Sequence, residues 1–133
     1  MAANFTAYIQ RTQSRTGVSL RGECTDLGAA QYLEAAIDEV ITNGRAVVWI
    51  DCQRLESITW QGQRAILNAD YRARAMGMVL QWCGMPKEVV EQLVASGLSL
   101  LLHLQPANGY RGPQQLLHDT LPISTKLQFP PNA

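Results

Sequence analysis

The sequence predicts an α/β fold in which a mostly parallel sheet of about five strands includes an N-terminal hairpin and packs against helices. One observation is the apolar run from Val47 to Ile50, whose β-branched and aromatic residues are typical of a strand covered on both faces. Another is the alternation of helix-type and strand-type segments that follows residue 25. A strand, a helix and a strand in succession imply a right-handed crossover, so this part of the sheet should be parallel.

The N-terminal third of the chain predicts the hairpin and the first helix. Residues 5–10 and 17–22 alternate apolar and polar side chains around a polar stretch, which indicates two antiparallel strands. Thr25 or Asp26 is the expected N-cap of a helix that ends at Asn43-Gly44. Apolar residues recur along this helix at three- and four-residue spacing, so they should face the core. They are Leu27, Ala30, Leu33, Ile37, Val40 and Ile41.

The later elements are predicted from apolar stripes and turn residues. A second helix should run from Trp60 to Met76 and end at Gly77, with one buried stripe. That stripe consists of Ile66, Ala69, Ala73 and Met76. Residues 78–83 predict a strand, residues 86–96 a helix with Pro86 in its first turn, and residues 98–104 a fifth strand. Residues 1–104 form the expected domain, and residues 105–133 a C-terminal extension that is packed on it or partly disordered.

Composition and charge favour an ordinary globular protein and exclude several classes of partner. The 133 residues fit one domain, 47% of them are hydrophobic, and 11 basic side chains balance 11 acidic ones. A net charge of zero gives no overall field for nucleic acid or an anionic membrane. No apolar run approaches the ~20 residues that span a bilayer, and the N-terminus lacks a signal-peptide pattern. We therefore expect a cytoplasmic protein that does not insert directly into a membrane.

The sequence contains no legible pattern of catalysis or metal binding. His103 and His118 have no cysteine or acidic residue at a ligand or triad spacing. Cys24, Cys52 and Cys83 form no CxxC pair, and we interpret them as small buried side chains. No glycine-rich phosphate loop occurs. These observations predict no enzymatic activity, no metal and no cofactor.

The charged residues of the two long helices are interpreted first as solvated surface. The acidic ones on the first helix are Glu34, Asp38 and Glu39. The basic ones on the second helix are Arg64, Arg72 and Arg74, which Arg54 joins. The alternative for the basic face is a contact with an acidic patch of a partner.

The junction that follows the central strand is the candidate site. Cys52 to Ser57 form a polar connection, Thr59 is the expected N-cap, and a helix should begin at Trp60. We expect Trp60 to be partly exposed, because an exposed tryptophan is the residue type most enriched at binding hot spots. Gly62, which has no side chain, should leave space for a partner above the indole. The candidate binding residues are Ser57, Thr59, Trp60, Gln61, Gly62 and Arg64, together with Asp51.

Asp51 has two interpretations. It ends the apolar run, so it should lie at the carboxyl end of a parallel strand, where α/β sheets usually place ligands. The simpler interpretation is structural, with the carboxylate accepting backbone N–H groups at the junction between strand and turn.

The central segment resembles the STAS domains, a family named for sulphate transporters and anti-sigma-factor antagonists. Ile50-Asp51-Cys52 is similar to the family's Leu-Asp-Leu strand end. Ile58-Thr59-Trp60-Gln61-Gly62 is similar to the apolar residue and the Asp-Ser-Ser-Gly or Asp-Ser-Thr-Gly motif that open its helix. Gly22-Glu23 with Thr25, and Ser96-Gly97-Leu98, resemble flanking signals of the family. The resemblance covers roughly residues 5 to 104, with the motifs in the family's order and spacing.

The resemblance implies a bacterial, regulatory module that binds proteins. Members of the anti-sigma-factor-antagonist type dock onto a kinase that is also the anti-sigma factor, and phosphorylation of a serine releases them. That serine aligns with Trp60, which cannot accept a phosphate, so the usual switch should be missing. One alternative is a constitutive STAS-like subunit of a complex that transports lipids or anions across a membrane. Another is a STAS domain that binds a nucleotide or lipid, and a second copy of the chain is a further partner to consider.

Overall fold

The fold is built on a five-stranded sheet with the strand order β1-β2-β3-β4-β5. The computed structural model describes residues 4–42 and 46–127. The strands are β1 (Phe5–Arg11), β2 (Thr16–Cys24), β3 (Val47–Ile58), β4 (Val79–Cys83) and β5 (His103–Gln105). β1 and β2 form an antiparallel hairpin, and the other neighbouring strands pair in parallel. This architecture confirms the predicted fold class.

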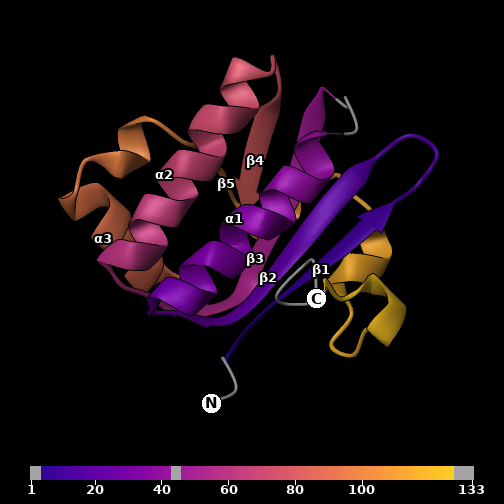
Figure 1. Ribbon diagram of the computed structural model, residues 1–133, viewed down its shortest axis with the longest axis horizontal. Helices are drawn as coiled ribbons and strands as arrows, with labels where there is room; N and C mark the ends of the chain where they lie inside the picture. The colour runs from indigo at the N-terminus through magenta and orange to yellow at the C-terminus, as the bar shows by residue number, and fades with distance from the viewer. Residues whose placement is uncertain (1–3, 43–45, 128–133) are drawn as a thin grey trace.

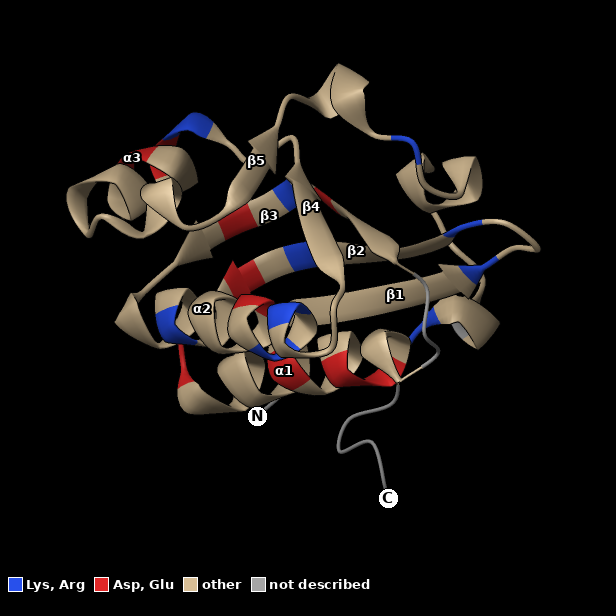
Figure 2. Cartoon of the chain, turned by 90° about the horizontal axis from the view of Figure 1, so that it is seen from above, with Lys and Arg blue, Asp and Glu red and all other residues tan. Residues whose placement is uncertain are grey.

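Helices cover both faces of the sheet. The helices α1 (Leu27–Ile41) and α2 (Trp60–Ala75) lie side by side on one face (Figure 1). The helix α3 (Lys87–Ala95) and residues 106–119 lie on the other face, which we call the second face (Figure 2). Lys126 and Leu127 pack along the edge of β1 instead. Short 3-10 helices follow, namely η1 (Leu98–Leu100), η2 (Ala107–Gly109), η3 (Gln114–Leu117) and η4 (Ile123–Thr125).

The core lies between the sheet and the pair α1 and α2. Val48 and Ile50 of β3 are fully buried there, as the apolar run predicts. A polar contact fixes α2 on β4, because the indole Nε1 of buried Trp82 donates to Oδ1 of Asp70 at 3.1 Å. The other carboxylate oxygen of Asp70 lies 3.0 Å from Nε of Arg74. The buried charge of Asp70 is therefore paired, which makes its burial tolerable.

The central strand is longer than its sequence indicates. β3 continues through the polar residues 52–57 to Ile58, so the expected turn there is wrong. The register with β2 shifts twice, once between Ser19 and Arg21 and again between Gly22 and Glu23, and each shift places an extra residue in β3. Burial consequently recurs at Cys52, Leu55 and Ile58, three residues apart, and the strand loses the alternation that identifies strands in a sequence.

Several helix predictions need smaller corrections. Leu27 and Met76 were expected on buried stripes, but both side chains are exposed, because Leu27 opens α1 and Met76 follows the end of α2. Pro86 is the N-cap of α3 rather than part of its first turn. The predicted stop of the first helix, Asn43-Gly44, lies outside the described residues.

The predicted fifth strand is shorter than expected. The chain reverses at Gly97, which has φ +82, and residues 98–100 form η1 instead of a strand. Only His103–Gln105 pair with β4. The apolar run from Leu98 to Leu101 therefore lies before the strand, and Leu100 is exposed.

The C-terminal segment packs against the sheet as far as the structure describes it. The ring of Tyr110 meets Trp49 of β3 edge-on at 6.4 Å, and its hydroxyl donates to the carbonyl of Pro113 at 2.8 Å. Lys126 bridges to Tyr8 at the outer edge of β1. Within residues 4–42 and 46–127, no helix has the length and apolar composition that crossing a membrane would require.

Candidate functional site

The amino end of α2 is fixed to the end of β2 by the backbone. Thr59 is extended, with φ −112 and ψ −171, and its N–H donates to the carbonyl of Cys24 at 3.2 Å. The Thr59 hydroxyl makes no capping hydrogen bond and instead donates to Oε1 of Gln61 at 2.6 Å. Thr59 is therefore the N-cap by position, but the expected side-chain cap is wrong.

Gly62 faces inward rather than toward solvent. A Cβ atom at this position would lie 2.5 Å from the carbonyl oxygen of Cys24 and 3.1 Å from Cβ of Ile58. The glycine therefore permits close packing of α2 on the end of β2, and the expectation that it clears space for a partner is wrong. The space beside the indole has a different origin, namely the groove between the two helices.

Trp60 is exposed, as the sequence predicts. It is the first residue of α2, and 65% of its surface is accessible. Leu27, the first residue of α1, is 64% accessible. Two large apolar side chains therefore lie exposed at the amino ends of neighbouring helices, and exposed apolar patches are typical of interaction sites.

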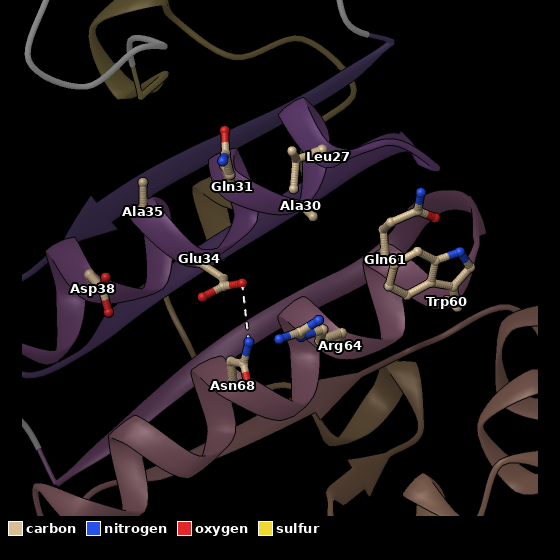
Figure 3. Close-up of a pocket in the computed structure, with 10 residues that line it drawn as sticks. All are labelled: Leu27, Ala30, Gln31, Glu34, Ala35, Asp38, Trp60, Gln61, Arg64 and Asn68. Carbon is tan, nitrogen blue, oxygen red and sulfur yellow. Dashed lines mark hydrogen bonds between the residues drawn. The ribbon is translucent and has the colours of Figure 1, made fainter.

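A groove of about 520 Å³ runs between α1 and α2 and begins at these two residues (Figure 3). α1 contributes Leu27, Ala30, Gln31, Glu34, Ala35 and Asp38, and α2 contributes Trp60, Gln61, Arg64 and Asn68. A hydrogen bond crosses the groove from Nδ2 of Asn68 to Oε2 of Glu34 at 3.5 Å (Figure 3). We call this surface the α1–α2 groove.

The charges beside the groove are mostly paired within the chain. Arg72 contacts Glu34 at 3.0 Å and Asp38 at 2.8 Å. Burial by itself lowers the pKa of Arg72, but the hydrogen bonds that it donates to Glu34 and Asp38 outweigh burial, and the pKa is raised. Arg64, in contrast, is exposed and makes no ion pair within the described residues.

These pairs change the interpretation of the helix surfaces. Glu34 and Asp38 pair with Arg72, and Glu39 pairs with Arg11 at 3.3 Å. The acidic face is therefore a set of contacts between elements and not only solvated surface. Arg64 is a cation that is available to a partner.

Asp51 and Ser57 lie apart from the other candidate residues. Asp51 is fully buried in the middle of β3 and not at its end. Its Oδ2 accepts a hydrogen bond from the Ser19 hydroxyl at 2.9 Å. Its Oδ1 accepts from the backbone N–H and from the side-chain amide of Gln53. Ser57 is a half-buried residue of β3 opposite Glu23. Thr59, Trp60, Gln61, Gly62 and Arg64 share the first turns of α2, so the structure brings only part of the expected set together.

The cysteines offer no reactive thiol. Cys24, Cys52 and Cys83 are all buried, as expected. Burial raises the pKa of Cys24 to about 12 and that of Cys83 to about 11, so both thiols stay protonated at neutral pH.

Among residues 4–42 and 46–127, no three His, Cys, Asp or Glu side chains gather as metal ligands would.

The contribution of α1 to the groove differs from the prediction. Leu27 fits the apolar spacing of the helix, and that spacing predicts a place in the core. Its position directly after the N-cap Asp26 was the signal that could have identified it, because a first-turn side chain points past the end of its helix.

Comparisons with known proteins agree with this geometry. A family model described as "Mlab, STAS domain" matches residues 8–108. A comparison with curated proteins found no match.

Solved structures share the fold at low sequence identity. An anti-sigma factor antagonist from Mycobacterium paratuberculosis is 19% identical over 79% of this chain and 90% of that chain, with a TM-score of 0.66. The anti-sigma factor antagonist SpoIIAA in its unphosphorylated form is 17% identical over 76% of this chain and 87% of that chain, with a TM-score of 0.62. The Bacillus cell fate determinant SpoIIAA in its phosphorylated form is 17% identical over 76% and 90%, with a TM-score of 0.58.

The family match covers residues 8–108, which is most of the chain. The chain therefore belongs to the STAS domain family.

Proposed function

We propose that this protein is a non-enzymatic cytoplasmic module that binds a protein partner through the α1–α2 groove and the amino end of α2. We include in this proposal the division into a domain, residues 1–104, and an extension, residues 105–133. The observation that carries the proposal is the exposure of Trp60, 65% accessible at the start of α2.

The groove has the chemistry of a protein-binding surface. Trp60 and Leu27 provide apolar anchors, and tryptophan is the residue most enriched at binding hot spots. Arg64, four residues after Trp60 on the same helix, can pair with a carboxylate of the partner. A partner segment with an apolar side chain for the rim and an acidic side chain for Arg64 would match this surface.

Regulation by phosphorylation at position 60 is not part of the proposed mechanism. One solved relative, SpoIIAA, is phosphorylated. The serine of the family motif aligns with Trp60 here, and an indole accepts no phosphate. The Thr59 hydroxyl is held by Gln61, so we propose that the interaction is constitutive.

Two assignments of the partner follow from the family. The first is an anti-sigma factor, as the relatives' names suggest for those proteins. The second is a complex that transports lipids or anions, in which a constitutive contact would be useful, and the loss of the phosphorylatable serine favours it. A small-ligand role at Asp51 has less support, because Ser19 and Gln53 already occupy its carboxylate.

The test compares two aromatic residues on the same helix. Tyr71 is 67% accessible, which closely matches Trp60, and it lies eleven residues further along α2, or ~16 Å. Wild-type, Trp60→Ala and Tyr71→Ala proteins are used to capture partners from the native cell, and the affinity of the captured partner is then measured with purified components. We expect Trp60→Ala to weaken binding by ~2 kcal/mol or more, and Tyr71→Ala to leave it nearly unchanged.

The outcomes separate the possibilities. Equal binding by wild-type and Trp60→Ala proteins would refute the proposed surface. Equal losses for Trp60→Ala and Tyr71→Ala would show that the whole outer face of α2 binds, and not its amino end. Stoichiometric phosphate on Thr59 after incubation with cell extract, detected by peptide mass analysis, would contradict the constitutive mechanism.

A further inference from the structure

A second hollow lies on the second face of the sheet, away from the α1–α2 groove. It has a volume of about 600 Å³, and its lining includes Tyr8, Arg21, Gln53, Arg54, Glu56 and Asp119. The C-terminal segment reaches it through Asp119, and α3 borders it at Pro86.

Two arginines lie directly opposite one another in this hollow. Arg21 of β2 is the register partner of Arg54 of β3. Figure 2 shows the blue bands of β2 and β3 next to one another. Two cations held this close repel one another, and the carboxylates of Asp51 and Asp119 lie beside Arg54. The pKa of Arg21 is lowered by burial and then by the charge of Arg54, while the charges of Asp51 and Asp119 act in the opposite direction.

Arg21 is occupied, and its role is to hold the C-terminal segment. Its guanidinium donates to the carbonyls of Leu116, His118 and Asp119 at 2.7–2.8 Å, and its Nε donates to the Ser19 hydroxyl at 3.0 Å. The ring of Tyr8 lies 5.1 Å from the guanidinium and holds it in place. Arg21 therefore acts as a fixed positive charge.

Arg54 is less fully used. Its Nη2 donates to the carbonyl of Leu117 at 3.0 Å and to Oδ1 of Asp119, while its Nη1 lies 4.0 Å from the buried carboxylate of Asp51. A guanidinium carries five N–H donors, and both of these hydrogen bonds come from Nη2. The N–H groups of Nε and Nη1 can therefore bind another acceptor. The side chain is 31% accessible and can be reached from solvent.

Asp119 occupies the place of an anion. Its carboxylate contacts Arg54, although its side chain is 92% accessible. Such a contact is made in water and contributes little, so an external anion can replace it at small cost. The hydrogen bond from Arg54 and the charge of that group lower the pKa of Asp119, so the carboxylate is ionised at neutral pH.

We propose that Arg54, supported by the fixed charge of Arg21, forms a site for a single phosphate group, which Asp119 occupies when no ligand is present. Planar guanidinium groups bind phosphate oxygens in a bidentate manner, which fits the free part of the Arg54 fork. Glu56 also lines the hollow, and its negative charge disfavours an extended polyanion such as a nucleic acid backbone. The ligand class is therefore a small phosphate or phosphate monoester.

Isothermal titration calorimetry of the full chain at constant ionic strength tests this site. The titrants are inorganic phosphate and a nucleoside monophosphate. Equal affinities would indicate a site for the phosphate group alone, and tighter binding of the monophosphate would indicate that the site also contacts the attached nucleoside. Asp119→Asn removes the competing charge and should bind phosphate up to about fivefold more tightly than wild type, because an exposed ion pair is worth little. Arg54→Gln should weaken binding by at least about tenfold.

The controls make each outcome decisive. Arg15→Gln removes an exposed arginine from the turn between β1 and β2 and should leave phosphate binding unchanged. If Arg54→Gln does not fold, Arg54→Lys keeps the charge but loses the fork, and it should bind more weakly than wild type. Unchanged affinity in the folded Arg54 variants, or no saturable binding by Asp119→Asn in the millimolar range, would overturn the proposal. None of these measurements depends on the α1–α2 groove, so the two proposals fail separately.

Discussion

Replacing Gly62 by alanine tests how α2 is attached to the sheet. Intrinsic helix propensity alone predicts that this change stabilises the protein by up to ~1 kcal/mol. The structure predicts the opposite, because the new methyl group would lie 2.5 Å from the backbone carbonyl oxygen of Cys24. That carbonyl also accepts the N–H of Thr59 at 3.2 Å, so α2 cannot move away without weakening this hydrogen bond.

The magnitude follows from these two opposing effects. Forcing an extra methyl group into a well-packed site costs ~1–3 kcal/mol, from which the propensity gain is subtracted. We expect a net loss of up to ~2 kcal/mol in the free energy of unfolding. Gly28, in the first turn of α1, is the matched control, because its added methyl group would meet only Oδ1 of Asp26 at 3.5 Å, an ordinary contact. Gly28→Ala should be neutral or slightly stabilising.

Urea titration followed by circular dichroism measures both variants. For a small domain with a slope of ~1–3 kcal/mol per molar urea, the Gly62→Ala midpoint should fall by roughly 1 M, and the Gly28→Ala midpoint should stay or rise. Because the methyl group displaces the turn that carries Trp60, Gly62→Ala should also weaken partner binding. If both alanine variants are equally stable, then α2 does not approach Cys24 as closely as described, and the geometry of the site is wrong.

Three further predictions concern the core, the surface and the thiols. Ile37 of α1 is fully buried, so Ile37→Ala should cost ~2–5 kcal/mol in a denaturant titration, and a loss below ~1 kcal/mol would mean that the wrong face of α1 points inward. Trp60→Ala should change the free energy of unfolding by less than ~1 kcal/mol, because an exposed residue contributes little to folding, and unfolding of this variant would identify the indole as packing. Burial raises the pKa of the Cys24 thiol from its ordinary value of 9.0 to about 12, so the unfolded chain loses this proton at lower pH than the folded chain. The free energy of unfolding should therefore fall as pH rises above 9.0 toward 12, and native alkylation at pH 8 should be slow until denaturant is added.

Much of the fold could be predicted because its buried elements keep regular periods. The face of α1 and the apolar run of β3 match the structure, since one helix stripe and one doubly covered strand bury their apolar residues in regular patterns. The second half of β3 could not be predicted. The strand β3 has one more residue than β2 at each of the two register shifts. Gln53 and Glu56 are consequently exposed between buried residues, and in the sequence this pattern resembles a polar turn.

The same irregularity explains the error about Asp51. If β3 ended at residue 51, the carboxylate would lie at the rim of the sheet, where ligands bind. Because β3 continues, Asp51 is buried in mid-strand, where it accepts the Ser19 hydroxyl. The segment after it carries Arg54 into register with Arg21 and forms the second hollow. A pairing between residues 33 positions apart depends on the strand register, and a single sequence does not specify that register.

The placement of Leu27 and Trp60 follows from a rule that needs only the strand order. β2 and β3 are parallel neighbours, so their carboxyl ends share one edge of the sheet, and the helices that follow them both begin at that edge. Side chains in the first turn of a helix lean toward its amino end, so Leu27 and Trp60 both project beyond the core at the same rim. When two successive helices each carry an apolar residue directly after the N-cap, both residues therefore lie exposed at the same edge of the sheet. This is why Leu27, which fits the apolar spacing of α1, belongs with Trp60 at the groove and not in the core.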